Sequence, residues 1–131
     1  MSPTILLKDG NVEMVLGTPG GSTIFTSVFQ TIVNIMDFDM SPYEAIQSTR
    51  FHHQLLPPDE ITYNGFTIGK TLPKEIISQL GKKGYKAIPH DYDFGDVQVI
   101  IREDESWIAA SDPRDRGDSR IISVPKSQVN Q

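Results

Sequence analysis

A pair of glycines stands where an apolar run gives way to a helical pattern, and this junction constrains the chain most strongly. Residues 17–25 read GTPGGSTIF. Because Gly20 and Gly21 carry no Cβ, another group can approach their backbone closely. Ser22 is a favourable N-cap for the apolar-periodic run that follows it. A helix start preceded by such unobstructed amides can bind an anion or a developing oxyanion. Taken locally, however, two glycines are a weak motif, and a tight structural turn explains them at least as well.

The spacing of the apolar residues predicts a succession of hairpins and helices. An Asp-Gly pair between two almost continuously apolar runs indicates a β-hairpin, and we expect both of its faces to be covered. Apolar residues at helical spacing then predict a largely buried helix. A serine followed by proline, with glutamate three residues after the serine, predicts a second helix start. In chain order, the predicted elements are strands over 4–8 and 12–16, helices over 22–38 and 41–49, an extended segment over 50–58, a strand over 60–63, a helix over 71–83, a strand over 85–88, and a hairpin of strands over 96–102 and 107–110.

This order of elements favours an α+β fold over a doubly wound parallel sheet, because hairpins flank the helices. We expect a single domain over residues 1–131, with Ile76, Ile77 and Leu80 turned inward and a polar, frayed tail from about 118 to 131. The hydrophobic content of 37% is lean for a chain whose first hairpin and first helix both need covering. We therefore expect the isolated chain to expose apolar surface, which would promote self-association.

Composition narrows the possible functions. The net charge of -5 argues against a nucleic acid or an anionic membrane as partner. The chain has no cysteine, which excludes disulfides, thiolate catalysis and zinc-thiolate sites. No apolar run approaches the length of a membrane span, and the first residues do not have the pattern of a signal peptide.

Several short pieces of the sequence together resemble the C-terminal part of the small subunit of γ-glutamyltranspeptidases. Each piece alone is a weak signal, but they occur in the family's order from Met1 to about Gly117, which makes the resemblance specific. The pieces are Met1-Ser2-Pro3-Thr4-Ile5, Gly17-Thr18-Pro19-Gly20-Gly21-Ser22, Asp37-Phe38-Asp39-Met40, Glu44-Ala45, Arg50-Phe51-His52-His53-Gln54-Leu55-Leu56-Pro57 and Ala110-Ser111-Asp112-Pro113-Arg114.

The resemblance implies an N-terminal-nucleophile hydrolase fold, an αββα sandwich formed by autocleavage of a precursor. It also implies that Gly20 and Gly21 contribute backbone amides to an oxyanion hole that contacts the substrate. Such donors must be fixed, close and free of side-chain bulk, and each contributes roughly 3 kcal/mol to lowering the barrier.

The family's nucleophile is the threonine that cleavage leaves at the start of the small subunit, and it lies upstream of the matched segment. A Ser-Ser pair that grips the γ-glutamyl substrate falls just before Met1. Thr4, Thr18 and Thr23 cannot replace the nucleophile, since none is a free N-terminus. We therefore expect a fragment that supplies the oxyanion loop and is inactive alone.

The complete enzyme implied by the resemblance transfers a γ-glutamyl group from glutathione-like donors to water or an amino acid, through a γ-glutamyl-threonine ester. The implied partners are the rest of the small subunit, the large subunit of the same precursor, and the small-molecule donor. No cofactor, metal, nucleic acid or membrane is expected, and the resemblance suggests a periplasmic or secreted location for a bacterial enzyme.

Other polar residues have simpler interpretations. Adjacent histidines in extended chain point in different directions, so a metal site at His52-His53 is disfavoured. We interpret Asp112 with Arg114 as a structural ion pair or turn cap, and Arg50 as a partner for buried carbonyls or an acid. The remaining expectations are a solvated hairpin tip at Asp104-Glu105, no calcium loop at Asp115, Asp118 and Ser119, and core positions for Trp107, Met14, Met36 and Met40.

Two alternatives to the γ-glutamyl transferase remain open. A related acylase, such as a cephalosporin acylase or a poly-γ-glutamate transpeptidase, would use the same glycine loop with different upstream residues. A non-enzymatic module would bind an anion at Gly20 and Gly21 or serve only in assembly.

Overall fold

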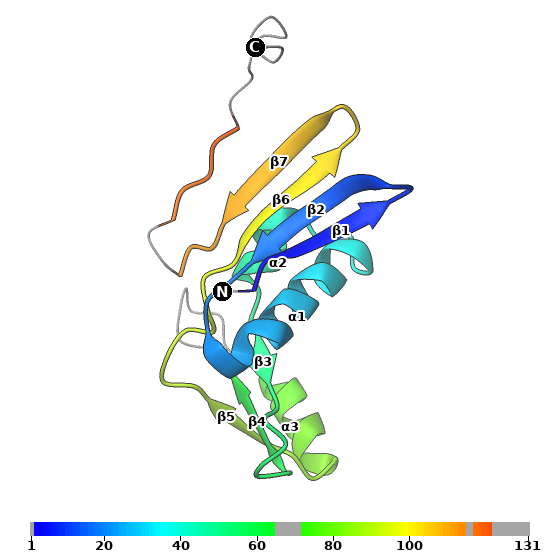
Figure 1. Cartoon of the computed structure of the whole chain (residues 1–131). Helices are drawn as coiled ribbons and strands as arrows, with labels where there is room; N and C mark the ends of the chain where they lie inside the picture. Colours follow the sequence, from blue (N-terminus) through cyan, green and yellow to red (C-terminus); the bar gives the residue numbers. More distant parts are fainter. Residues whose placement is uncertain (1, 65–71, 115–116, 122–131) are drawn as a thin grey trace, which may run out of the picture.

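Two β-sheets organise the chain in the computed structural model, which describes residues 2–64, 72–114 and 117–121 (Figure 1). Four antiparallel strands form the larger sheet, in the order β1-β2-β6-β7, and three strands form the smaller one, in the order β3-β4-β5. The strands are β1 (Thr4–Lys8), β2 (Asn11–Gly17), β3 (Phe51–His52), β4 (Glu60–Tyr63), β5 (Lys86–Pro89), β6 (Gln98–Glu103) and β7 (Ser106–Ser111). The helices are the short 3-10 helix η1 (Gly21–Thr23), α1 (Ile24–Met36), α2 (Pro42–Gln47) and α3 (Lys74–Lys82).

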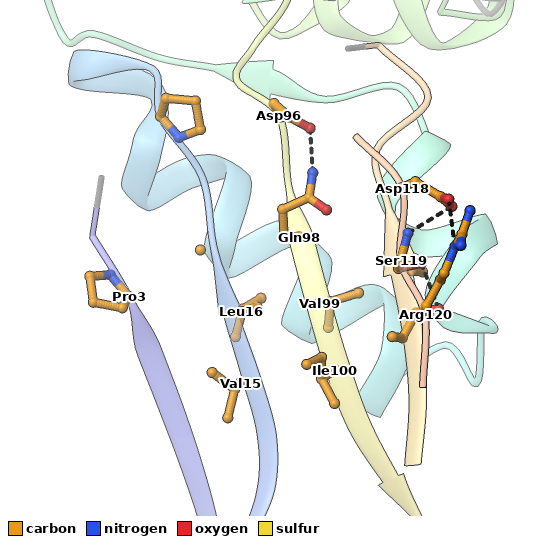
Figure 2. A pocket seen from close by; sticks show the side chains of 14 residues that line it. Pro3, Val15, Leu16, Asp96, Gln98, Val99, Ile100, Asp118, Ser119 and Arg120 are labelled. Carbon is orange, nitrogen blue, oxygen red and sulfur yellow. Dashed lines mark hydrogen bonds and ion pairs between the residues drawn. The ribbon is translucent and has the colours of Figure 1, made fainter. Parts of the chain in front are cut away.

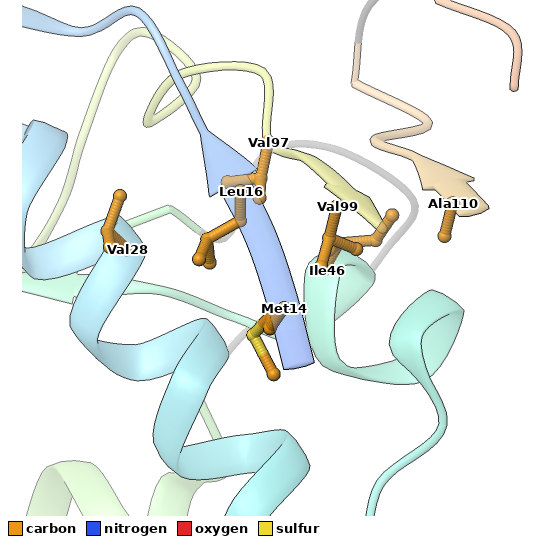
Figure 3. Close-up of a cluster of buried hydrophobic side chains, with 7 residues drawn as sticks. All are labelled: Met14, Leu16, Val28, Ile46, Val97, Val99 and Ala110. Atoms are coloured by element: carbon orange, nitrogen blue, oxygen red, sulfur yellow. The ribbon is translucent and has the colours of Figure 1, made fainter. Parts of the chain in front are cut away.

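The core lies between the larger sheet and helices α1 and α2 (Figure 3). Side chains alternate between the two faces of a strand, so one face of the sheet turns its residues toward these helices. Val28 comes from α1 and Ile46 from α2. The buried cluster is completed by Met14, Leu16, Val97, Val99 and Ala110. The prediction that Met14 is a core residue is confirmed.

The opposite face of the larger sheet carries an apolar row that none of the described helices covers. Each of the four strands contributes one apolar residue to this row, and the register places each of these residues opposite one on the neighbouring strand. In sheet order they are Ile5, Val15, Ile100 and Ala109. Ile5 is 60% exposed and Ile100 is 43% exposed. Trp107 lies two residues from Ala109 on the same face and is 40% exposed. We call the surface formed by Ile5, Val15, Ile100, Trp107 and Ala109 the open sheet face.

The first helix is amphipathic rather than buried all round. Phe25, Phe29 and Met36 follow helical spacing along one side of α1, and all three are more than half exposed. We call these three residues the α1 ridge. The expectations of a largely buried helix, of a first hairpin covered on both faces, and of core positions for Met36 and Trp107 are therefore wrong for this chain. The expectation of exposed apolar surface is confirmed.

The predicted N-cap of the first helix is also wrong. Ser22 lies inside η1, and α1 begins only at Ile24, with no side-chain capping hydrogen bond. The chain tightens here because the backbone N–H and the hydroxyl of Thr23 both donate to the carbonyl of Gly20, at 3.1 and 2.9 Å. In contrast, the predicted start of the second helix is confirmed. Ser41 and Glu44 form a reciprocal capping box, and α2 ends at Gln47, two residues before the predicted end.

The smaller sheet is built differently from the larger one. Strands β4 and β5 are parallel, and α3 lies between them in the chain, as a parallel pair requires. Helix α3 buries none of its residues: Ile77 and Leu80 are half-buried, while Ile76 is exposed. The predicted start of this helix at Thr71 lies outside the described residues.

The elements confirm the predicted mixed α+β class, since antiparallel pairing predominates and helices are not interleaved with every strand. Residues 117–121 run back beside β7 (Figure 1), where the Ser119 hydroxyl donates to the carbonyl of Ala109 at 3.1 Å. The frayed tail is predicted from about residue 118; its described part, 118–121, is held beside β7 by this hydrogen bond, and residues 122–131 lie outside the described residues. None of the described helices is both long and apolar enough to span a membrane.

Candidate functional site

The glycine loop connects the end of β2 to η1 in a backbone conformation that favours glycine. Gly20 has φ 138° and ψ 12°, and Gly21 has φ 58°. A Cβ on Gly20 would lie 2.8 Å from the hydroxyl oxygen of Thr23, too close for an ordinary contact. With ψ near zero, the amide nitrogen of Gly21 lies on the same side of the Gly20 Cα as the amide nitrogen of Gly20. The loop therefore presents two successive amides from one side, as anion-binding turns do.

These two amides are free within the described part of the chain. Neither the N–H of Gly20 nor that of Gly21 donates to an acceptor among the described residues, and both glycines are exposed. Their neighbours are held instead. The hydroxyl of Thr18 donates to the carbonyl of Pro19 at 2.8 Å, and Thr23 binds the carbonyl of Gly20. The loop thus has fixed carbonyls and unpaired amides, which is the polarity that an oxyanion site needs.

A second segment, approaching β6, packs against this loop from behind. The backbone N–H of Asp96 donates to the hydroxyl of Thr18 at 2.8 Å, and the side chain of Thr18 is fully buried. Gly95 has φ 67°, and a Cβ there would overlap the Thr18 hydroxyl and the carbonyl of Pro19. Neither Thr18 nor Gly95 was predicted from the sequence to be part of the site. Their contact joins residues 77 or more positions apart, and no local pattern marks it.

Beside this contact lies a buried cluster of one carboxylate and two guanidinium groups. Asp112 pairs with Arg50 through Oδ2 and with Arg114 through Oδ1, the latter at 2.9 Å. The same carboxylate accepts the backbone N–H of Val97 at 3.1 Å. Both guanidinium groups also donate to the carbonyl of Ile46 in α2. The interpretation of these three charged residues as structural partners is confirmed.

Electrostatics in this cluster follow from burial. Removal from water lowers the pKa of the Arg50 guanidinium, the Asp112 carboxylate raises it, and the Arg114 charge lowers it again. Because an arginine titrates far above neutral pH, Arg50 stays charged and needs its counterion. The cluster therefore ties the end of β7, the start of β6 and the end of α2 together.

The adjacent histidines point in different directions, as expected. His52 is buried, with Nδ1 3.1 Å from the hydroxyl of Thr26 and Nε2 2.6 Å from Oε1 of Gln54. His53 instead lies 3.1 Å from the carbonyl of Pro58. Among the described residues, no three His, Asp or Glu side chains come together as a metal-binding group.

Only part of the calcium candidate at Asp115, Asp118 and Ser119 lies in the described chain. Asp118 pairs with the exposed Arg120 at 3.3 Å, and Asp115 lies outside the described residues. The hairpin tip at Asp104-Glu105 is exposed, as predicted. Met40 is half-buried, so its exposure is intermediate between that of the buried Met14 and that of the exposed Met36.

A groove of about 480 Å³ borders the glycine loop (Figure 2). It runs from Gly17 and Pro19 onto the open sheet face, where Val15, Ile100 and Ala109 line it. Polar groups line two of its edges. Gln98 donates to Asp96 at 2.6 Å near the loop, and residues 118–120 lie beyond β7. The groove thus reaches from the first residues of the glycine loop onto an apolar surface, and Gly20 and Gly21 are not among its lining residues.

Comparison with known proteins identifies the family to which the chain belongs. The model of the γ-glutamyltranspeptidase family matches residues 1–122. The chain belongs to the γ-glutamyltranspeptidase family. The glutathione hydrolase proenzyme of Pseudomonas aeruginosa is 41% identical over 122 residues, which are 93% of this chain and 21% of that protein. This chain thus spans about a fifth of that curated relative.

Solved structures agree with the family assignment. The γ-glutamyltranspeptidase of Pseudomonas nitroreducens, solved in complex with L-DON, superposes with a TM-score of 0.85 at 41% identity, over 94% of this chain and 62% of that one. The cephalosporin acylase of Bacillus halodurans superposes with a TM-score of 0.72 at 23% identity, over 86% of this chain and 20% of that one. At that identity the second match shows a shared fold alone.

Proposed function

We propose that this chain is the C-terminal part of the small subunit of a γ-glutamyl-transferring N-terminal-nucleophile hydrolase, and that it supplies the oxyanion hole. The observation that carries the proposal is the pair of amides at Gly20 and Gly21, which bond to no acceptor among the described residues and are presented from one side of a loop whose carbonyls are hydrogen-bonded. The family to which the chain belongs includes glutathione hydrolases, which supports this reaction class.

In the proposed reaction, a threonine hydroxyl outside this chain attacks the γ-carbonyl carbon of a glutathione-like donor. The carbonyl π electrons move onto oxygen, and the two glycine amides donate hydrogen bonds to the resulting oxyanion. Collapse of the intermediate expels the amine and leaves a γ-glutamyl-threonine ester, which water or an amino acid then cleaves. The amides act most strongly where negative charge develops, so they lower the barrier more than they strengthen substrate binding.

The exposed apolar surfaces support the proposed partners. In an αββα sandwich, a second sheet would cover the open sheet face, and the large subunit or the rest of the small subunit would cover the α1 ridge. Both surfaces carry large side chains, among them Ile5, Trp107 and Phe25, that a complete protein would bury. A single domain over residues 1–131 would then be completed by chain from elsewhere in the precursor.

The test is a graft of residues 1–122 into the Pseudomonas aeruginosa glutathione hydrolase, followed by Gly20→Val. We expect kcat for a γ-glutamyl anilide to fall by about 10²- to 10³-fold, the usual effect of disabling one oxyanion donor. Autocleavage of the precursor should fall much less. Gly84→Val is the matched control, since Gly84 also has a positive φ but no atom lies within 4 Å of its Cβ position.

Two results would contradict the proposal. A Gly20→Val graft that turns over as fast as the unsubstituted graft would remove the oxyanion role. Turnover of the γ-glutamyl anilide by the isolated chain would contradict the expectation that the nucleophile lies outside it.

A further inference from the structure

Two threonine side chains hold the carbonyl ends of the two peptide units that carry the candidate oxyanion donors. The peptide that ends in the N–H of Gly20 begins with the carbonyl of Pro19, which accepts the hydroxyl of Thr18 at 2.8 Å. The peptide that ends in the N–H of Gly21 begins with the carbonyl of Gly20. That carbonyl accepts the hydroxyl of Thr23 at 2.9 Å and its backbone N–H at 3.1 Å.

Because the peptide bond is planar, these contacts also set the direction in which the two amide N–H groups point. In a trans peptide, the N–H and the C=O lie in one plane and point in opposite directions. Both peptides are trans. A hydroxyl that fixes the carbonyl of such a unit therefore fixes the direction of its amide without touching the amide itself.

We propose that Thr18 and Thr23 are positioning residues that aim the amides of Gly20 and Gly21 at the oxyanion. This proposal rests on the proposed function, because it assigns the origin of the geometry that the oxyanion hole needs. Neither threonine contacts the reacting atoms, and each acts through one carbonyl.

The burial and hydrogen bonds of Thr18 explain how the amides of Gly20 and Gly21 keep their direction in an exposed loop. Pro19, Gly20 and Gly21 are all exposed, and a glycine pair by itself samples a wide range of conformations. Thr18 is fully buried, and its hydroxyl accepts the backbone N–H of Asp96 while donating to Pro19. The hydroxyl thus uses its donor and an acceptor site at once, and it links the loop to the strand that begins at Gln98.

Four variants of the graft test the proposal: Thr18→Val, Thr18→Ser, Thr23→Val and Thr23→Ser. Valine keeps the shape of threonine and removes the hydroxyl, whereas serine keeps the hydroxyl. We expect each valine variant to lower kcat about 10-fold or more, with KM changed by less than about 2-fold, and each serine variant to recover most of the loss. Thr31→Val is the matched control, because Thr31 is buried and its hydroxyl, within the described chain, bonds only to the carbonyl of Ser27 in its own helix.

An inhibitor that mimics the tetrahedral intermediate distinguishes an effect on the direction of the two amides from a general loss of stability. Affinity for a boronic acid analogue of the γ-glutamyl group, which forms an anionic tetrahedral adduct, should fall by the same factor as kcat in Thr18→Val. Affinity for glutamate, a product-like ligand without that adduct, should be nearly unchanged. A role confined to stability would lower the melting temperature and leave kcat and boronate affinity unchanged well below it.

The outcomes distinguish failure of the two proposals. If Gly20→Val leaves kcat unchanged, the oxyanion role itself fails. If Gly20→Val lowers kcat but neither Thr18→Val nor Thr23→Val does so beyond Thr31→Val, the amides act without the threonines and only the positioning role fails.

A measurement on the chain itself applies even where a graft variant does not assemble. NMR relaxation of the 131-residue chain reports the order parameters of the Gly20 and Gly21 amides. We expect values near those of rigid backbone in the parent, about 0.85, and values below about 0.6 for Gly20 in Thr18→Val. An unchanged order parameter for Gly20 in Thr18→Val would overturn the proposal.

Discussion

Replacing Asp112 tests whether the buried charge cluster holds the chain together. The Asp112→Ala variant removes a carboxylate that pairs with two guanidinium groups, each with a side chain no more than 2% exposed. Removing one partner of a buried ion pair costs about 3–5 kcal/mol, because the remaining charge stays buried without compensation. Here two arginines lose their counterion and the N–H of Val97 loses its acceptor, so we expect a value at the upper end.

Urea unfolding of the 131-residue chain measures the effect. With an m value of roughly 2 kcal/mol per M, a loss of about 5 kcal/mol lowers the midpoint by about 2.5 M. Because exposed apolar surface favours self-association, parent and variants need the same protein concentration. Asp112→Asn keeps the shape and loses the charge, and we expect it to lie between the parent and Asp112→Ala.

The control is a second Asp–Arg pair of the same chemistry on the surface. Asp118 and Arg120 lie 3.3 Å apart, with side chains 73% and 82% exposed. Exposed pairs contribute about 0–1 kcal/mol, so Asp118→Ala should move the midpoint by less than about 0.5 M. Equal midpoint shifts for Asp112→Ala and Asp118→Ala would refute the reasoning, because burial would then make no difference.

Three further predictions concern the helix cap, a surface ion pair and the open sheet face. Ser41→Ala removes the capping box of α2 and should cost about 1 kcal/mol in urea unfolding, and an unchanged midpoint would contradict it. Lys86 lowers the pKa of Asp59 by hydrogen bonding, so this contribution to stability is present above the ordinary pKa of Asp59 and is lost as pH falls through the lowered value. An NMR titration should return the Asp59 pKa toward its ordinary value in Lys86→Met, and an unmoved titration would exclude the pair as the cause. Ile100→Lys and Trp107→Lys should reduce the binding of a hydrophobic dye and self-association in light scattering, and undiminished dye binding would mean that the open sheet face is not the surface responsible.

Features set by neighbouring residues were predictable from the sequence. The capping box at Ser41 needs only residues three positions apart, and the hairpin at Asp9-Gly10 needs only a turn that tolerates positive φ. The family resemblance depended on short pieces in order, and the family match over residues 1–122 confirms it. The position of the glycine loop between a strand and a helix was likewise predictable.

Features set by what packs against a side chain were not predictable in the same way. The hydrophobicity of Phe25, Phe29 and Trp107 predicted burial, but burial depends on what lies opposite, and these side chains remain 65%, 63% and 40% exposed in the described chain. The N-cap assignment failed for a related reason. Ser22 has the right chemistry, yet Thr23 binds the carbonyl of Gly20 and draws the chain into a 3-10 turn first.

The candidate site shows how a local motif comes to depend on distant residues. The glycines are adjacent, but the carbonyl of Pro19 is held by Thr18, and Thr18 is held by the backbone of Asp96. The next residue in that segment, Val97, donates to the buried Asp112. A defect in the charge cluster should therefore reach the amides of the loop through three hydrogen bonds and the Asp96–Val97 peptide. We infer that a variant of Asp112 that still folds will lose turnover in the graft as well as stability, whereas a variant of Asp118 will lose neither.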